Sequence, residues 1–380
     1  MRVLQLGKYY DPYMGGIETH LSILCDGLRT SDEVEVLVCN SHLRTERDRV
    51  NGVPVTRAGA WLRALSTDLC PALVTELSRC HYDVLHLHTP NPMGMLAYLL
   101  AKKPRAHRLV ITHHSDVVRQ AGLRRVLGPL FAATMGRAHC IVATSPNYAK
   151  TSEELEPYRD RVRVVPYGID PRPFRDPAHD PLAQELRSRF GRRVVLGTGR
   201  LIYYKGFEVL LEAMAQVEGH LVLVGDGPLR GALEARAKTL GILQRVTFAG
   251  EIHQREIPAW YRAADVFALP SIARSEAFGI VQLEAMASGL PVVNTELDSG
   301  VPFVSLLGQT GLTVPPRDPS ALASALNTLL DDGALRIKFG NQARERVLEH
   351  FTSERMVRDL RAIYREASVS VSEPGVVVSA

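Results

Sequence analysis

Two glutamates stand eight positions apart in "SEAFGIVQLEAMASGLPVV", residues 275–293, where most of the neighbouring residues are apolar. Carboxylates are rarely buried without a partner, so Glu276 and Glu284 need donors of hydrogen bonds. A strand predicted over 265–271 and a helix that begins near Gly279 place Glu276 in a loop and Glu284 on the packed side of the helix. The hydroxyl groups of a sugar or a ribose would satisfy both carboxylates, and so, in a purely structural role, would backbone N–H groups.

Two cations lie in the segment "GTGRLIYYKG", residues 197–206, at the end of another predicted strand. Arg200 offers a planar fork of donors and Lys205 a point charge, which are the two kinds of cation that proteins use for phosphate. The sequence GxxxxGK followed by Ser or Thr does not occur, so a P-loop is excluded. The alternative is an ordinary loop with two cations that face solvent.

The first half of the chain has two further candidate sites at strand ends. Gly15 and Gly16 separate a predicted strand from a helix, where small residues and free N–H groups let a phosphate approach closely. His113, His114 and Asp116 lie at the end of another predicted strand, and two histidines with an aspartate favour a functional role. Because no third ligand stands at a metal-binding spacing and no DxD motif occurs, we expect no metal ion.

The composition is that of a globular protein with room for two domains. Of its 380 residues 46% are hydrophobic and 23% charged, and no apolar run approaches the roughly 18 residues of a transmembrane helix. The N-terminus reaches charged and turn residues too early for a secretory signal, and the five cysteines show no CxxC spacing. We therefore expect reduced thiols and a cytoplasmic protein.

Positive charge is concentrated between Val84 and Ser152, where nine basic residues accompany one acid, Asp116. A basic face indicates an anionic surface or a phosphorylated partner, although an ordinary solvated surface would look the same. The segment 119–137 alternates arginines with apolar residues, so this predicted helix could lie on an anionic membrane surface or simply pack on the sheet.

Short apolar runs alternate with amphipathic segments in both halves of the chain, which predicts parallel sheets covered by helices. The proline-rich segment "PYGIDPRPFRDPAHDP" interrupts this alternation and predicts an interdomain linker. The fold class is therefore α/β, with two doubly wound domains, a cleft between them, and ligands at the carboxyl ends of the strands. The predicted parts are domains over 1–168 and 192–352, a linker over 169–191, a helix over 353–367 and a disordered tail over 368–380.

Together these segments resemble the group 1 (family 4) retaining glycosyltransferases, whose fold, GT-B, has two facing Rossmann-like domains. The resemblance covers nearly the whole chain. It rests on Gly15-Gly16, the His114 segment, "GTGRLIYYKG", "VGDGP" and above all the spacing E-x7-E from Glu276 to Glu284. It implies that the helix over 353–367 crosses back onto the N-terminal, acceptor-side domain.

The resemblance also implies a role for each candidate residue. Arg200 and Lys205 would bind the donor pyrophosphate, Glu284 the nucleotide ribose, and Glu276 the hydroxyls of the transferred sugar. His114, with Asp116 close by, would lie beside the reacting face of that sugar, and neither a metal ion nor another cofactor is expected. The catalytic residues would be His114, Asp116, Arg200, Lys205 and Glu276, and the other donor-binding residues Gly15, Gly16, Gly250, Ile252, His253, Phe278, Gly279, Ile280 and Glu284.

The implied activity is transfer of a hexose, with retention, from a nucleotide-diphospho-sugar to a lipid-linked or saccharide acceptor. "HHSDVVRQ", "ATSPNYAKTSEEL" and "GVPFVSLLGQTGLTVPP" are similar to bacterial enzymes that add mannose-type sugars to polysaccharide or O-antigen precursors, which suggests GDP-mannose and α-mannosyl transfer. Gln309 departs from the acid usual at its position. The alternatives are a UDP-sugar-dependent transferase, a nucleotide-sugar epimerase, and a non-enzymic protein that binds nucleotide sugars or anionic lipids. We expect a cytoplasmic protein, with peripheral attachment to the inner face of the cytoplasmic membrane as an open alternative, and no nucleic-acid partner.

Overall fold

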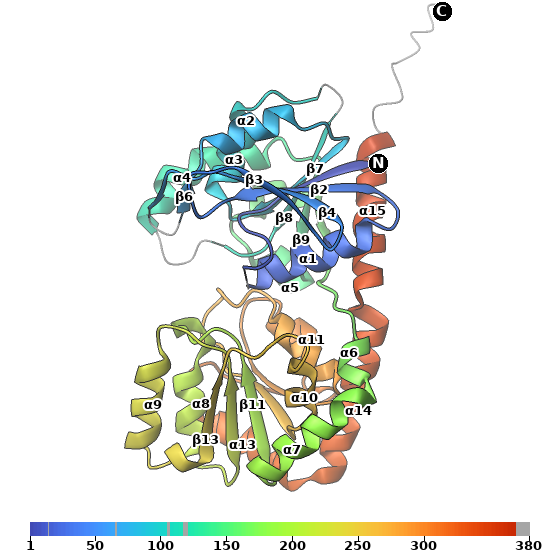
Figure 1. Cartoon of the computed structure of the whole chain (residues 1–380). Helices are drawn as coiled ribbons and strands as arrows, with labels where there is room; N and C mark the ends of the chain where they lie inside the picture. The colour runs from blue at the N-terminus through green and yellow to red at the C-terminus, as the bar shows by residue number, and fades with distance from the viewer. Residues whose placement is uncertain (14, 65–66, 105–106, 117–120, 370–380) are drawn as a thin grey trace, which may run out of the picture. The chain divides into compact units, whose positions relative to one another are not determined.

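The computed structural model describes residues 1–13, 15–64, 67–104, 107–116 and 121–369, and these residues form two compact units. Unit 1 consists of Met1–Gly168 together with the C-terminal segment from Ser353, and unit 2 consists of Ile169–Thr352. In each unit helices cover a sheet, as Figure 1 shows. Most of the tail predicted over 368–380 lies outside the described residues.

The main sheet of unit 1 has, in the described part, eight strands in the order β10-β9-β8-β7-β1-β2-β4-β3. Neighbouring strands are parallel except for β3 and β4, which form an antiparallel hairpin at one edge. A short ribbon, β5–β6, lies outside this sheet. The bounds are β1 Arg2–Leu6, β2 Glu33–Cys39, β3 Glu46–Val50, β4 Val53–Ala58, β5 Leu62–Ala64, β6 Thr67–Leu69, β7 Val84–Thr89, β8 Arg108–His113, β9 Cys140–Ala143 and β10 Val162–Val164.

Apolar cores lie on both faces of this sheet, because successive side chains of a strand point to opposite faces. Val3 joins the core under α1 and α15, whereas the next residue, Leu4, joins the core under α2 and α3. The helix predicted over 353–367 is α15, which belongs to unit 1 and packs against α1. The helices are α1 Gly16–Leu28, α2 Ala72–Arg79, α3 Pro92–Leu100, α4 Ala121–Met135, α5 Pro146–Thr151, η1 Glu156–Arg161 and α15 Ser353–Val369.

The segment predicted as a linker, 169–191, is not irregular: it is part of unit 2 and carries α6 Arg172–Arg175, η2 Pro177–His179 and α7 Asp180–Phe190. Its prolines stand in the first turns of these helices, where a missing N–H removes no intrahelical bond. The buried side chains of Leu186 and Phe190 then stabilise α7 by packing. The prediction of an interdomain linker over 169–191 was therefore wrong.

The sheet of unit 2 is parallel throughout its described strands, in the order β13-β12-β11-β14-β15-β16. The order makes β11 and β14 neighbours although two strands separate them in the sequence. The strands are β11 Val194–Thr198, β12 His220–Val224, β13 Val246–Gly250, β14 Val266–Leu269, β15 Val292–Thr295 and β16 Gly311–Val314. The helices are η3 Tyr203–Lys205, α8 Phe207–Met214, α9 Arg230–Thr239, η4 Leu243–Arg245, α10 Ile257–Arg262, α11 Ile280–Ala287, α12 Val301–Val304, α13 Pro319–Asp331 and α14 Gly333–His350.

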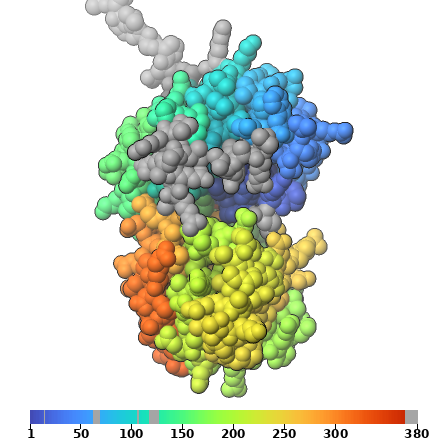
Figure 2. All heavy atoms as spheres, turned by 90° about the vertical axis from the view of Figure 1, so that its left-hand side faces the viewer, coloured from blue at the N-terminus to red at the C-terminus, as the bar shows by residue number. Residues whose placement is uncertain are grey.

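The surface of unit 2 is dominated, on the face drawn in Figure 2, by the yellow atoms of residues around α9 and β13.

No helix among the described residues combines the length and the apolar character needed to cross a bilayer. The segment 119–137, a predicted helix that could either bind a membrane surface or pack on the sheet, forms α4 from Ala121 onward. Arg119 lies outside the described residues, so attachment to a membrane stays a prediction.

Candidate functional site

The residues singled out in unit 2 lie at the carboxyl edge of its sheet. The loop after β11 carries Arg200 and Lys205, and the loop after β14 carries Glu276. Because β11 and β14 are neighbouring parallel strands, these two loops leave the sheet side by side. The sheet order thus brings together two segments that are about 70 residues apart in the chain.

Lys205 and Glu276 form an ion pair in which Nζ lies 2.6 Å from Oε2. Both residues are buried, with 9% and 7% of their surfaces exposed, and the Ser271 hydroxyl donates to the same carboxylate oxygen at 3.1 Å. Burial favours the neutral form of Lys205, but the adjacent Glu276 carboxylate outweighs it and the pKa of Lys205 is raised. Lys205 therefore neutralises Glu276, in addition to any contact it makes with a diphosphate.

The backbone after Lys205 is tightly constrained. Gly206 has φ +69°, in the left-handed region, and a Cβ at this position would collide with the carbonyl oxygen of Pro270 at the end of β14. Only glycine therefore allows the loop after β11 to lie against the loop after β14. This close approach is what holds Lys205 within reach of Glu276.

Replacing Gly206 by alanine is expected to destabilise unit 2 by about 2 kcal/mol or more, because the left-handed conformation and the collision with Pro270 act together. The matched control is Gly231→Ala on α9, where an added Cβ meets nothing within 4 Å and the change should be neutral or slightly stabilising. Urea denaturation of both variants measures the difference. Equal midpoints for the two variants would contradict the constraint.

Glu284 lies on α11, and a residue of α10 forms a hydrogen bond with its carboxylate. The Tyr261 hydroxyl donates to Oε2 of Glu284 at 2.7 Å, and Thr198 at the end of β11 lies 2.9 Å from the same hydroxyl. Burial raises the pKa of Glu284, while the Tyr261 bond and the charge of Lys205 act in the opposite direction. Among the described residues no donor bonds to Oε1 of Glu284. One carboxylate oxygen is thus left for a ligand, as a role in binding hydroxyl groups requires.

The other donor-binding residues predicted in unit 2 are also at this edge of the sheet, but they are spread along it. Phe278 is buried, and Gly279 caps α11 with φ +75° and without a side-chain bond to the first turn. The N–H groups of Ile280 and Val281 are therefore open to an anion, whereas that of Gln282 already donates to the carbonyl oxygen of Gly279 at 2.9 Å. Arg200 is exposed. Gly250, Ile252 and His253 follow β13, two strands away from β11.

The predicted glycines of unit 1 stand at the start of α1. Gly15 is the N-cap, in an extended conformation that any residue adopts, and Gly16 is the first residue of the helix. A Cβ on Gly15 would meet the carboxylate of Glu18. Because this carboxylate is the mobile end of a side chain and the backbone is extended, neither feature requires glycine at position 15.

His113 and His114 point to different surroundings, since successive residues at the end of a strand face opposite ways. His113 lies between two carboxylates, with Nε2 3.4 Å from Asp116 and 3.2 Å from Glu154. Burial favours its neutral form, but bonds to Asp116 and Glu154 prevail and raise the pKa of His113. Asp116 also accepts from Tyr148 at 2.8 Å and from Ser152 at 2.6 Å. Of the two predicted histidines, His113 is therefore the one that the structure places beside Asp116.

His114 belongs to a separate, buried network. Its Nε2 lies 2.9 Å from Nδ1 of His88, Nε2 of His88 lies 2.8 Å from Oε1 of Gln5, and the Tyr167 hydroxyl bonds to Nδ1 of His114. Burial holds the pKa of both His88 and His114 well below the usual value, so both rings are neutral. Both ring nitrogens of His114 already have partners within unit 1, so its predicted place beside the sugar stays a prediction.

Several of these residues were not singled out from the sequence. Tyr261 and Ser271 have ordinary apolar or loop surroundings in the sequence, and only the strand order connects them to the two glutamates. His88 could have been found from the sequence, because "HLH" stands at the end of a predicted strand. That strand, β7, pairs with β8, so His88 lies beside the end of β8. Partners of this kind come from other strands and helices rather than from nearby positions, so spacing along the chain does not indicate them.

Two family models match the chain, "Glycosyltransferase Family 4" over residues 14–172 and "Glycosyl transferases group 1" over residues 180–346. The D-rhamnosyltransferase WbpZ of Pseudomonas aeruginosa is 34% identical over 359 residues, which cover 93% of each of the two chains. The chain belongs to the group 1 (family 4) glycosyltransferases. A second relative of this glycosyltransferase, the O-antigen chain mannosyltransferase C of Escherichia coli, is 33% identical and covers 94% of this chain and 96% of its own. The glycosyltransferase is accordingly a hexosyltransferase, as expected.

Solved structures confirm the fold of the glycosyltransferase. A sucrose-phosphate synthase from Thermosynechococcus elongatus has a TM-score of 0.82 at 24% identity and covers 97% of this chain and 99% of its own. HepE from Anabaena, in complex with UDP-glucose, has a TM-score of 0.79 at 22% identity and covers 96% and 100%. Both similarities extend over the two units, which confirms the GT-B architecture of two Rossmann-like domains.

Proposed function

We propose that this glycosyltransferase transfers α-mannose from GDP-mannose, with retention, to a lipid-linked or saccharide acceptor in bacterial O-antigen or related polysaccharide synthesis. The two relatives that span the chain support this choice of sugar, since one is named a D-rhamnosyltransferase and the other a mannosyltransferase. D-Rhamnose is D-mannose without the 6-hydroxyl, so both sugars share the configuration of the ring carbons. A manno-configured sugar is what these two names have in common.

The observation that carries the proposal is the pair of carboxylates at one edge of the unit 2 sheet. Glu276 is neutralised by Lys205, so it can accept from sugar hydroxyls without an uncompensated buried charge. Glu284 has one oxygen bonded by Tyr261 and the other open, which suits the two hydroxyls of a ribose. Two acceptors of this kind lie beside cations and beside the start of α11, which has no side-chain cap, and together these groups match the parts of a nucleotide-diphospho-sugar.

In the proposed reaction the charge that develops on the departing diphosphate is stabilised by Arg200, by Lys205 and by the first N–H groups of α11. No metal ion is required in this scheme, because these cations and amides take its place. Gly250, Ile252 and His253 would flank the base, Gly15 and Gly16 would approach the phosphates, and His114 would lie beside the sugar. No carboxylate is an evident covalent nucleophile, which favours attack from the face that the diphosphate leaves, through an oxocarbenium-like transition state.

A UDP-sugar is the competing donor. HepE has been solved with UDP, with UDP and glucose, and with UDP-glucose, so the same fold accommodates a uridine nucleotide in that protein. A nucleotide-sugar epimerase is the less favoured alternative, since it would convert its donor without an acceptor. Both alternatives use the same two glutamates and differ in the base or in the fate of the sugar.

We expect GDP and GDP-mannose to raise the melting temperature of the enzyme more than UDP, ADP or their sugars, because a ligand that binds the native state stabilises it. At a ligand concentration of 100 times Kd the stabilisation is about 2.7 kcal/mol. GDP-D-rhamnose in the same panel distinguishes the sugars of the two relatives. Stabilisation by UDP without stabilisation by GDP would overturn the choice of donor, and release of an epimerised donor would overturn transfer.

A further inference from the structure

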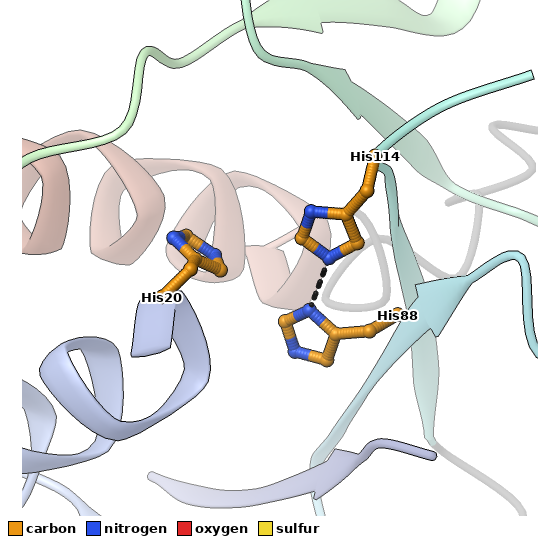
Figure 3. Close-up of side chains that lie close together, drawn as sticks. All are labelled: His20, His88 and His114. Atoms are coloured by element: carbon orange, nitrogen blue, oxygen red, sulfur yellow. Dashed lines mark hydrogen bonds between the residues drawn. The ribbon is translucent and has the colours of Figure 1, made fainter. Parts of the chain in front are cut away.

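Three histidines from separate elements of unit 1 lie around one point, as Figure 3 shows: His20 on α1, His88 on β7 and His114 directly after β8. Their ring centroids are 5.2 to 5.8 Å apart, and each residue offers a nitrogen within 4.8 Å of those of the other two. All three side chains are buried. The convergence does not depend on chain proximity, because the three residues are far apart in the sequence.

His20 is the unusual member of this group. It is 3% exposed, and both of its ring nitrogens are buried without a hydrogen-bond partner among the described residues. Burial lowers its pKa to about 3, so the ring is neutral and keeps a lone pair. A buried polar group without a partner costs folding free energy, and the ring of His20 makes T-shaped contacts with the rings of His88 and His114. A bound species that accepts this lone pair would remove the cost.

The hydrogen-bond partners of His88 and His114 allow one ring nitrogen of each to offer a lone pair to the same bound species. The carboxamide oxygen of Gln5 can only accept, so Nε2 of His88 carries the proton and Nδ1 presents a lone pair. Without a metal ion, Nε2 of His114 therefore carries the proton and donates to Nδ1 of His88 at 2.9 Å. Nε2 presents a lone pair once this proton moves to Nδ1 of His114, from which the Tyr167 hydroxyl can accept. Histidines that bind metal ions typically donate their second N–H in this way, which fixes the orientation of the ring.

We propose that His20, His88 and His114 bind a transition-metal ion, zinc by preference, through Nδ1 of His88, Nε2 of His114 and one ring nitrogen of His20. Three neutral imidazoles are an established ligand set for zinc, with Zn–N distances of about 2.0–2.1 Å. The nitrogens lie within 4.8 Å of one another, and side-chain shifts of up to about 0.7 Å bring atoms at such separations within this distance of a common point. The ion would link α1, β7 and the residue after β8, and would fix the ring of His114.

A second cluster of His113, Asp116 and Glu154 has similar spacing, but it carries no such proposal. Nε2 of His113 is already paired with both carboxylates, and Nδ1 lies 2.9 Å from the Thr89 hydroxyl. The charges of this cluster are satisfied by its own members. The three-histidine site shares His114 with the proposed sugar site, but it lies in unit 1 and needs neither Lys205 nor Glu276.

The test is metal binding by the full-length chain, expressed without a histidine tag and freed of metal with a chelator. Titration with Co²⁺ should give one equivalent per chain and the strong visible absorption of a four-coordinate site, and Zn²⁺ should displace it. Zn²⁺ alone should raise the melting temperature. His20→Gln should lower Co²⁺ affinity at least tenfold and leave the metal-free protein folded, because it removes a group without partners.

His220→Gln in unit 2 is the matched control, since this histidine has a side-chain partner, Thr247, and lies outside the site. It should keep the wild-type stoichiometry. His88→Gln should abolish the visible band, and if that variant does not fold, the His20→Gln result decides. Weak binding without a visible band, or binding that is unchanged by His20→Gln, would overturn the proposal and leave the cluster as a hydrogen-bonded part of the core.

Discussion

Replacing Lys205 by methionine is expected to destabilise unit 2 by about 3–5 kcal/mol and to reduce transfer about 100- to 1000-fold. The stability loss follows from the burial of Glu276, whose carboxylate loses the ammonium 2.6 Å away. The loss of transfer follows from the cation that the proposed reaction uses on the departing diphosphate. Denaturation curves and initial rates measure the two effects separately.

The double variant Lys205→Met with Glu276→Gln distinguishes a purely structural pair from a catalytic one. It has no buried charge left, so most of the stability should return, whereas transfer should stay low because both ligand-binding groups are missing. Lys238→Met, a change of an exposed lysine on α9, is the control and should alter neither quantity. Recovery of transfer together with stability would assign the pair to the scaffold alone.

Replacing Glu284 by glutamine is expected to raise the stability of the enzyme at neutral pH while it weakens donor binding about tenfold, or about 1.4 kcal/mol. Burial raises the pKa of Glu284, so ionisation at neutral pH costs folding free energy that the amide avoids. The amide oxygen can still accept from Tyr261. Ribose hydroxyls, however, lose a charged acceptor for a neutral one, and hydrogen bonds to charged groups are the stronger kind.

The sign of the pH dependence follows from the raised pKa. Glu284 contributes its full stability below the pKa of an unfolded glutamate, about 4.3, and this contribution is lost as the pH rises through the higher folded value. The stability gap between variant and wild type should therefore be absent in acid and should widen toward neutral pH. Calorimetry across this range, with titration of the nucleotide donor at pH 7, tests both statements. A variant that is less stable at pH 7 but binds donor normally would make Glu284 structural.

The central strands and the helix that carries Glu284 could be predicted from the sequence because apolar runs and their periodicity reflect burial directly. β3 could not, because this exposed edge strand, "ERDRV", has almost no apolar residues. α6 and α7 were missed for another reason, since prolines that interrupt a helix and prolines that begin one look alike in a composition count. The edge of the sheet and the first turn of a helix are places where burial does not dictate residue type.

The candidate residues of the donor site could be identified, but their partners could not. That Lys205 reaches Glu276 depends on β11 lying beside β14, and strand order is a property of the whole sheet rather than of either loop. The same applies to Tyr261 and Glu284, whose bond joins α10 to α11. Spacing along the chain likewise gave no indication that His20 would meet His114.

Unit 1 is discontinuous in the chain, and this has a consequence for synthesis on the ribosome. Its last helix, α15, follows the whole of unit 2, yet Tyr364 of that helix bonds to His86 on the central strand β7 at 2.6 Å. A nascent chain can therefore complete unit 2, the continuous segment 169–352, while unit 1 still lacks part of its core. Unit 2, which carries the proposed donor site, can thus be finished before unit 1, although unit 1 begins the chain.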